Sequence, residues 1–326
     1  MSTYAVKPDE VEAKVKEWKE EYPDLVRVER LKQYGGFTLF AITVSDQNKP
    51  LNEKLGHLFH VPHAHEPAGT AAIVDYIDRL LKGDNKNLFL AIKKREQVLR
   101  KCFLTFIPDG NPQGRFRSPE KFWDGRKYTN KEFLEIAFGI NENGERFPRY
   151  GYWSLKEHNP KSIGIVYEQI SEHEFVEPNR DLRSSLMKMI RHLLSKRSYM
   201  QILALHQTEF EHSKYNAEVI LPCIQRELPT KIQKYNIDWG KRIIKRWRDF
   251  GANPVPEPKP LGYKGEQREY FIKCWADIYR QIPTLTVEVQ NNNIKTPPRT
   301  QVLLQELAID TSVMVLLKRA LTRELT

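Results

Sequence analysis

Cysteine and long apolar runs are both scarce in this sequence. Three cysteines, Cys102, Cys223 and Cys274, are spread over 326 residues, and this odd, widely spaced set argues against a disulfide framework and favours a reducing compartment. No run approaches the roughly 18 apolar residues of a membrane-spanning helix, and the charged segment 1–21 lacks the apolar stretch of a secretory signal. We therefore expect a cytoplasmic protein without a membrane partner.

An excess of acidic side chains is also missing. Lys and Arg number 52 against 42 Asp and Glu, which gives a net charge of +10. The basic runs 93–101 and 241–249 are typical of solvated helix faces, and neither contains the interleaved glycines and aromatics of an RNA-binding signature. We expect no nucleic-acid partner. A basic field that attracts an acidic substrate is the alternative interpretation.

Apolar periodicity predicts strands that alternate with helices along the chain. Strands are expected at 25–31, 37–44, 57–62, 99–108, 200–206 and 284–289, and helices at 9–22, 71–81, 181–197, 270–282 and 301–323. Residues 115–160 are predicted to be irregular, and the Pro- and Gly-rich stretch 251–265 to be a surface loop. The pattern indicates an α/β fold formed by a single domain, 1–326, with a mostly parallel mixed sheet and helices on both faces.

Polar residues stand where three of these strands end. HVPHAHEPAGT follows strand 57–62, His206 ends strand 200–206, and Glu288 lies near the end of strand 284–289. Sites in open α/β sheets form beyond the carboxyl ends of strands. A His and a Glu in the spacing H-x-x-E, with a distant His, offer the nitrogen and oxygen donors that zinc prefers, and a further carboxylate could take a proton from bound water.

Three histidines of the first segment compete for the ligand position. They are His60, His63 and His65. Because alternate strand residues point to opposite faces, His60 is expected to point differently from a ligand in the loop. A histidine-rich surface turn is the alternative to a metal site.

The segment HVPHAHEPAGTAAIVDYIDRL resembles the zinc-binding segment of the zinc carboxypeptidases of the carboxypeptidase A/B type, with a strand, H-x-x-E, small residues and a helix. The resemblance continues in order along almost the whole chain. EEYPDLVRVERL resembles the family's N-terminal helix and hairpin, and FIPDGNPQGR its Asn-Pro-x-Gly segment. LALHQTE resembles the strand of the third metal ligand, and IPTLTVEV the strand of the catalytic carboxylate.

This resemblance implies a metal centre and the residues around it. It implies that Zn²⁺ is bound by His63, Glu66 and His206, and that Glu288 is the general base. It also implies an arginine that stabilises the oxyanion near the metal. By spacing, Arg126 in FWDGRK is the first candidate for that role, and Arg115 and Arg117 are the alternatives.

The chain departs from the family at the substrate carboxylate. Exopeptidases of the family grip it with an Asn-Arg pair within a G-x-D-x-N-R stretch, and we align FGINENGERFPR with that stretch. Asn143 then takes the place of the Asn, Gly144 stands where the Arg would be, and Arg146 or Arg149 would have to reach in. Asn141 would replace the aspartate that orients a zinc-bound histidine.

Three further residues are assigned by position relative to Glu288. Tyr263 matches the family's mobile tyrosine over the substrate, with Tyr270 as the alternative, and Trp275 matches a tryptophan next to the specificity pocket. Lys273 would then lie near the pocket floor and favour an acidic terminal side chain. The alternative places Lys273 on the wet face of its helix.

The function that follows is that of a zinc metallocarboxypeptidase, which hydrolyses a C-terminal or near-terminal amide bond of a peptide. One alternative is an aspartoacylase-like deacylase of N-acyl amino acids. The other is a catalytically silent, basic binding module on the same scaffold.

Overall fold

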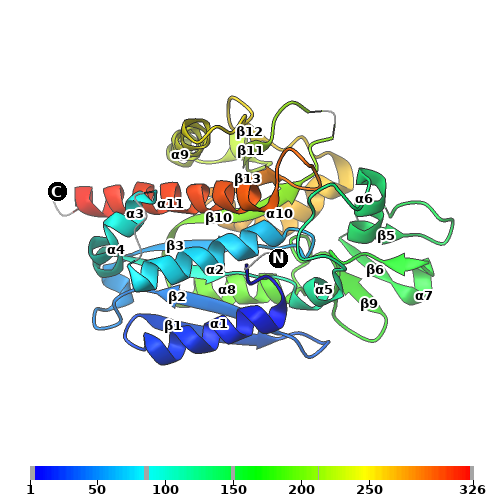
Figure 1. Ribbon diagram of the computed structural model, residues 1–326, viewed down its shortest axis with the longest axis horizontal. Helices are drawn as coiled ribbons and strands as arrows, with labels where there is room; N and C mark the ends of the chain where they lie inside the picture. Colours follow the sequence, from blue (N-terminus) through cyan, green and yellow to red (C-terminus); the bar gives the residue numbers. More distant parts are fainter. Residues whose placement is uncertain (1–3, 84–87, 148–150, 212, 324–326) are drawn as a thin grey trace.

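The computed structural model describes residues 4–83, 88–147, 151–211 and 213–323 (Figure 1). Over these residues an eight-stranded sheet has the strand order β1-β2-β4-β3-β10-β13-β11-β12. In chain order its strands are β1 (Val26–Lys32), β2 (Thr38–Val44), β3 (Leu55–His60), β4 (Cys102–Ile107), β10 (Tyr199–Thr208), β11 (Ala217–Leu221), β12 (Lys259–Pro260) and β13 (Thr284–Gln290).

The sheet is mixed, with a parallel centre. Strands β4, β3, β10 and β13 are parallel neighbours, whereas β1, β2 and β4 pair antiparallel, as do β11 and β13. The predicted α/β class and mixed sheet are confirmed. Parallel strands end at the same edge, so the segments after β3, β10 and β13 meet there.

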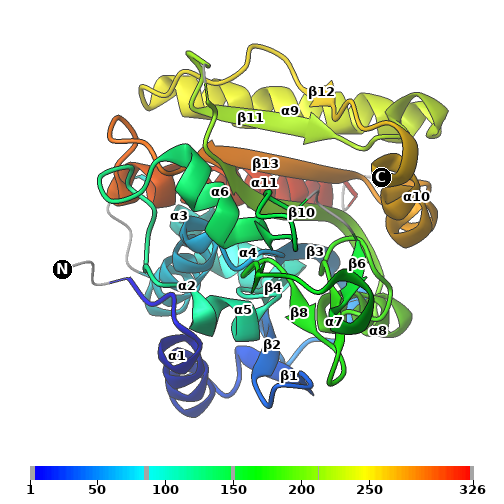
Figure 2. The same ribbon diagram turned by 90° about the vertical axis from the view of Figure 1, so that its right-hand side faces the viewer.

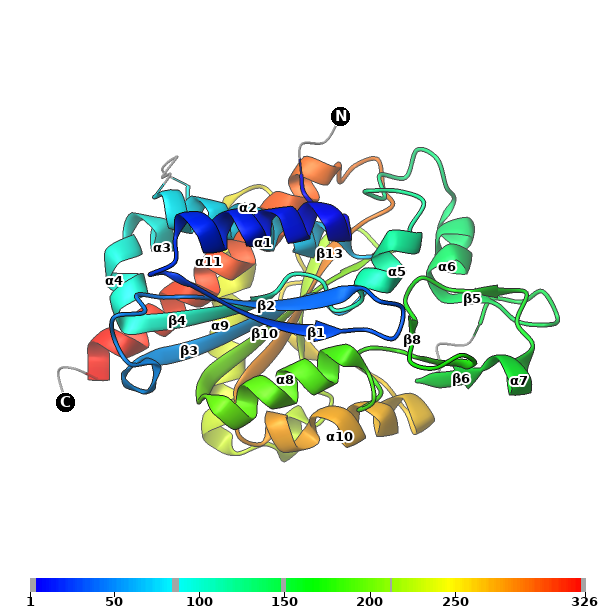
Figure 3. The ribbon, with the colours of Figure 1, turned by 90° about the horizontal axis from the view of Figure 1, so that it is seen from below.

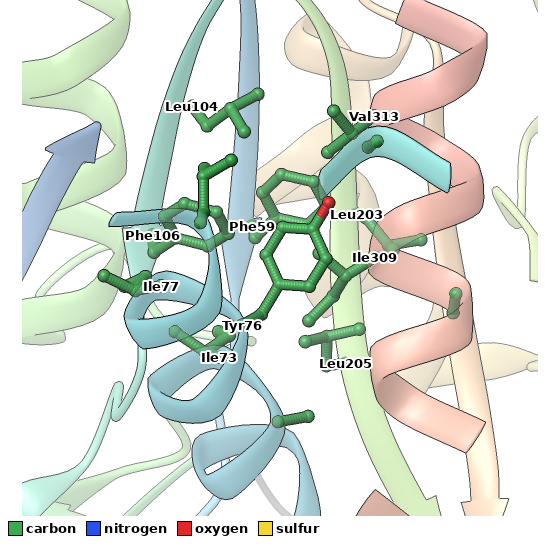
Figure 4. Close-up of a cluster of buried hydrophobic side chains, with 14 of the residues drawn as sticks. Phe59, Ile73, Tyr76, Ile77, Leu104, Phe106, Leu203, Leu205, Ile309 and Val313 are labelled. Carbon is green, nitrogen blue, oxygen red and sulfur yellow. The ribbon is translucent and has the colours of Figure 1, made fainter. Parts of the chain in front are cut away.

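Helices cover both faces of the sheet (Figure 3). One face carries α1 (Pro8–Glu21), α2 (Pro67–Lys82), α9 (Thr230–Asp249) and α11 (Pro298–Arg323), and the other carries α8 (Ser185–Lys196) and α10 (Gly265–Tyr279). Alternation along the strands divides the core accordingly. Phe59 and Leu203 pack against α2 and α11 together with Tyr76 (Figure 4), whereas Leu58 and Ile202 face α8 and α10.

The last helix is apolar enough to resemble a membrane span, contrary to the sequence expectation. Within the described residues, one stretch, Pro298–Thr322, is long and apolar enough by length and composition, and 72% of its most apolar window is buried inside the protein. It packs against α2 and α9. Its apolar character is therefore explained by its position in the core.

The segment between β4 and α8 contains more regular structure than expected. It holds α5 (Pro112–Arg117), α6 (Asn130–Phe138), α7 (Leu155–His158) and two small sheets, β5 (Gly139–Ile140) with β7 (Ser162–Ile163), and β6 (Tyr152–Ser154) with β9 (Glu174–Val176) and β8 (Glu168–Gln169). Figures 1 and 2 show these elements gathered at one end of the molecule. The missed signal for α6 is the capping box Thr129 with Glu132.

A second difference concerns the start of β4. Residues Arg95–Lys101 form α4, which follows the short α3 (Leu90–Lys93), so the strand predicted at 99–108 begins only at Cys102. Ser184 is the N-cap of α8, and its hydroxyl accepts a hydrogen bond from the Met187 N–H, so Asp181 lies outside that helix. The other predicted elements appear within a few residues of their expected bounds.

Candidate active site

The first two metal-ligand candidates lie on the loop between β3 and α2. The Glu66 N–H donates a hydrogen bond to the carbonyl of His63, which folds the loop into a turn. Pro67 begins α2 at the position where a missing N–H costs nothing. The turn brings His63 Nδ1 to 2.9 Å from Glu66 Oε1, and both side chains are buried.

The third candidate comes from β10 and reaches the same carboxylate. His206 Nδ1 lies 3.1 Å from Glu66 Oε1, across 140 positions of sequence. His206 is also directly opposite Glu288 on the parallel strand β13. One nitrogen or oxygen atom from each of Glu66, His206 and Glu288 lies within 4.8 Å of the others. The structure therefore brings together all four residues that the resemblance assigned to zinc and general base.

The electrostatics of this cluster suit a cation. Burial by itself would raise the pKa of Glu66, but the imidazoles of His206 and His63 hold that pKa well below its usual value. Within the described part of the chain, Glu66 Oε2 is buried and has no hydrogen-bond partner. Two imidazole nitrogens and one carboxylate form a donor set that zinc accepts in catalytic sites, with a further position left for water. The residues present thus fit Zn²⁺.

The two competing histidines occupy different positions. His60 is buried and its ring stacks on Trp275, with 5.5 Å between centroids, and burial lowers the pKa of His60 to about 3. His65 is nearer to the cluster: its Nε2 is 3.7 Å from Glu66 Oε1, and its ring packs against Phe133. Among the described residues, two groups of side chains bring their ligand atoms within 4.8 Å of one another: Glu66 with His206 and Glu288, and His63 with His65 and Glu66. His60 belongs to neither group.

Glu177, just after β9, is a functional candidate that the sequence analysis missed. Its Oε1 accepts a hydrogen bond from His63 Nε2. Because a carboxylate only accepts, this contact selects the tautomer in which His63 Nδ1 carries the lone pair that a metal needs. Glu177 Oε2 accepts from the Asn179 N–H at 3.1 Å and lies 3.6 Å from Arg180 Nε. One buried carboxylate therefore links a ligand imidazole to a guanidinium.

These contacts correct the alignment of the Asn-Arg stretch. Asn141 and Asn143 lie on a solvent-facing turn, where the Asn143 N–H donates to Asn141 Oδ1 at 3.0 Å, so neither reaches the imidazole of His63. Arg149 lies outside the described residues. A second segment, Glu-Pro-Asn-Arg at 177–180, also matches D-x-N-R with one carboxylate exchanged for another, and it contains the carboxylate that contacts His63.

Arg180 is buried at the wall of the site. Its Nη2 donates to the hydroxyl of Tyr263 at 3.2 Å, and its guanidinium carbon lies 5.2 Å from the ring centroids of both Tyr263 and Phe271. The carbonyl of Asn179 accepts a hydrogen bond from Trp275 Nε1 at 3.0 Å. Stacking and hydrogen bonds hold the guanidinium in one orientation, which suits recognition of a carboxylate.

Two hollows meet at Glu288. The smaller has a volume of ≈ 50 Å³. Its lining includes His63, His206 and Glu288 and, among the apolar and aromatic residues, Ile220, Leu221, Leu261, Phe271, Tyr279 and Leu285. The larger is an open groove of ≈ 680 Å³ whose lining includes Glu66, Arg180, Glu288 and an aromatic wall of Phe133, Phe138 and Phe147. Tyr263 lines both, and Arg146 lines the groove. Tyr263 and Arg146, both predicted to bind substrate, thus line the candidate site.

Lys273 and Arg126 lie elsewhere. Lys273 is exposed on α10 and does not line the small cavity, so it is not at the predicted pocket floor. Arg126 keeps 78% of its side chain exposed, and its Nε lies 3.7 Å from Asp124 Oδ2. Arg117 donates to backbone carbonyls of residues 163–167. Arg115 is buried against the loop that carries His63. The structure therefore places Arg115, rather than Arg126, beside the metal-ligand loop.

The fold and the site together define an α/β protein with a buried His and Glu cluster that could hold a metal ion, and comparison with solved structures specifies the fold. The chain is similar to thrombin-activatable fibrinolysis inhibitor (TM-score 0.59, 13% identity, 96% of this chain and 74% of that one). It is also similar to a metallo-carboxypeptidase from Pseudomonas aeruginosa (TM-score 0.58, 11% identity, 93% of this chain and 68% of that one). A third similar structure is carboxypeptidase A from Helicoverpa armigera (TM-score 0.57, 13% identity, 96% of this chain and 73% of that one).

The chain therefore has the metallocarboxypeptidase fold, which the resemblance of its motifs implied. Searches by sequence find no matching protein family and no matching curated protein. At 11–13% identity the structural likeness establishes the fold alone.

Proposed function

We propose that this protein is a zinc-dependent carboxypeptidase. The observation that carries the proposal is the convergence of His63, His206 and Glu66, with Glu288 within 4.8 Å of the last two. When bound, zinc would supply a Lewis acid for the scissile carbonyl and lower the pKa of its water. Glu288, which is not one of the assigned ligands, would act as the general base: its carboxylate would accept a proton from the attacking water and pass it to the leaving amine.

The terminal carboxylate of the substrate is assigned to Asn179 and Arg180. Arg180 lines the groove and Asn179 lines the small cavity, so the two residues stand where the hollows join. A guanidinium binds a carboxylate through two parallel hydrogen bonds. A terminal carboxylate held there would leave the preceding amide bond near Glu288. The open groove then receives the residues before the cleaved bond.

The small cavity is assigned to the side chain of the terminal residue. Its described lining contains no Lys or Arg, and its walls away from the metal are mostly aliphatic and aromatic. A charged side chain there would lose its hydration without gaining a partner. The cavity is also much smaller than the groove, ≈ 50 Å³ against ≈ 680 Å³. These features favour a short, neutral, apolar terminal residue over the acidic one that Lys273 suggested.

The experiment compares zinc content with turnover. A chelator should abolish hydrolysis of peptides with a free C-terminus, and zinc should restore it. Glu288→Gln should keep its zinc and lose turnover by about 10²–10⁴-fold. Glu172→Gln is the control, because Glu172 is exposed on the turn before β9 and lines neither hollow. Full activity in Glu288→Gln would contradict the assigned base.

The deacylase alternative is separated by the substrate panel. A deacylase would cleave small N-acyl amino acids in preference to peptides of four or more residues, whereas the groove of ≈ 680 Å³ favours peptides. A protein that binds zinc but cleaves neither class would be the silent binding module.

A further inference from the structure

Arg115 lies beneath the loop that carries two of the ligand candidates. It belongs to α5, the short helix after β4, where the Asn111 side chain caps the first turn by accepting from the Gly114 N–H. Its side chain is 1% exposed. A long cationic side chain is almost never fully buried unless it has partners, so its contacts indicate what it does.

One nitrogen of this guanidinium contacts both ligand residues. Arg115 Nη2 lies 3.1 Å from the carbonyl oxygen of His63, 3.4 Å from that of Glu66 and 3.0 Å from the hydroxyl of Thr70. Thr70 in turn donates to the carbonyl of Pro108 at 2.7 Å. The backbone that carries the two ligands, the first turn of α2 and the segment after β4 are thus joined at a single point.

A second buried group, the carboxylate of Asp109, balances the charge of Arg115. Its Nε is 3.5 Å from Asp109 Oδ2, and both groups are buried. Burial raises the pKa of Asp109, and the nearby guanidinium offsets part of that rise. Arg115 lines neither hollow of the site. It is therefore placed to hold the loop and is kept away from the substrate.

We propose that Arg115 is a positioning residue for the metal centre: by holding the carbonyls of His63 and Glu66, it sets the affinity for zinc. The inference rests on the proposed metal site but goes beyond the ligands themselves. A loop held before binding loses less conformational entropy when the ion arrives. A lysine at position 115 would keep the positive charge but lack the planar guanidinium, so it would keep only part of the hydrogen-bond geometry at the loop.

The test measures zinc affinity in Arg115→Lys and Arg115→Met, by competition with a chromogenic chelator. Each variant should bind zinc about 10–100-fold more weakly than the wild type, the usual effect of losing a group that orients metal ligands, and Arg115→Lys should be the milder. The visible spectrum of the Co²⁺-loaded protein should change too, because it reports ligand geometry. Loss of a merely structural contact would leave that spectrum unchanged.

Arg117→Lys is the matched control. Arg117 lies on the same helix and donates to three backbone carbonyls, those of Ile163, Gly164 and Tyr167, away from the ligand loop. It should leave zinc affinity and the Co²⁺ spectrum unchanged. Equal weakening in both lysine variants, or wild-type affinity in Arg115→Lys and Arg115→Met, would overturn the proposal.

Two further measurements cover a variant that fails to fold and separate the role of Arg115 from the proposed function. If Arg115→Met does not fold, Thr70→Val removes one acceptor of the same nitrogen and should weaken zinc binding by a smaller factor. A wild-type protein that binds zinc but cleaves no peptide would contradict the proposed function and leave the Arg115 test intact. A wild-type protein that binds no zinc would overturn both.

Discussion

His206 and Glu288 lie directly opposite each other on the parallel strands β10 and β13. Side chains at matched positions of neighbouring strands point to the same side of a sheet, so a ligand candidate and a general-base candidate face the same space. Glu66 reaches this space from the loop after β3, which pairs with the other side of β10. Three adjacent strand ends therefore supply the centre of the candidate site.

The contact between Glu177 and His63 predicts a role in metal binding. Glu177→Gln keeps the shape of the side chain but removes the charge that orients the imidazole, so zinc affinity should fall by about 10–100-fold. Affinity is measured by competition with a chelator. Glu172→Gln, on the exposed turn before β9, is the control and should bind zinc like the wild type. Unchanged affinity in Glu177→Gln would remove this role.

The position of Arg180 predicts a dependence on the free C-terminus. Arg180→Lys should raise KM for a peptide acid, because a bidentate contact becomes a single one. A C-terminally amidated peptide lacks the carboxylate, so its slow turnover should be almost the same in wild type and variant. The measurement is kcat and KM for the matched acid and amide. An equal loss for both substrates would indicate general damage to the site.

The lining of the small cavity predicts the preferred terminal residue. Among peptides that differ only at the C-terminus, Ala, Val and Leu should be cleaved faster than Lys, Arg, Asp or Glu. Leu261→Asp places a carboxylate on a half-buried loop that lines the cavity and should improve relative cleavage of terminal Lys and Arg by about tenfold or more. Lys273→Ala should leave the ranking unchanged, because Lys273 lies outside the cavity. A preference for terminal Asp or Glu that Lys273→Ala removes would refute the assignment of the small cavity to the terminal side chain.

A buried carboxylate in the helix layer predicts a pH dependence of stability. Burial raises the pKa of Glu306 to about 8, although its Oε1 lies 3.2 Å from Arg79 Nε. The folded state therefore keeps a proton that the unfolded chain loses near its ordinary pKa of 4.5. The folded state binds more protons than the unfolded state in that window, so its stability falls as pH rises from about 4.5 to 8.

The substitution Glu306→Gln should abolish this loss of folding stability at high pH. The variant should match the wild type at pH 5, where the carboxyl is already neutral, and exceed it at pH 8. An increase of 1 kcal/mol in the free energy of unfolding raises Tm by roughly 2–4 °C for domains of 150–250 residues. Thermal unfolding at the two pH values therefore measures the difference between variant and wild type. Glu20→Gln, on the exposed face of α1, should leave the pH dependence unchanged. A destabilised Glu306→Gln at pH 8 would mean that the ion pair with Arg79 prevails.

The sequence predicted the central sheet better than the segment between β4 and α8. Strands and long helices carry a periodic apolar signal, so β10 and α11 were found within a few residues. The elements of 112–176 are short, and their signals are local, such as the Thr129 capping box. An alignment across such a segment slides easily, which is why Asn143 was matched to the Asn-Arg pair and the proposed Asn179 was overlooked.

The sequence alone indicated which residues had to be considered as ligands and base. Periodicity placed polar residues where apolar strands end, and the resemblance of those segments to the zinc carboxypeptidases implied the roles of His63, Glu66, His206 and Glu288. Only the tertiary structure decided which side chains support them. Glu177 meets His63 across 114 positions, and Lys273 faces solvent because of how α10 is rotated against the sheet. Such contacts depend on the path and packing of the whole backbone, and no local pattern of residues encodes them.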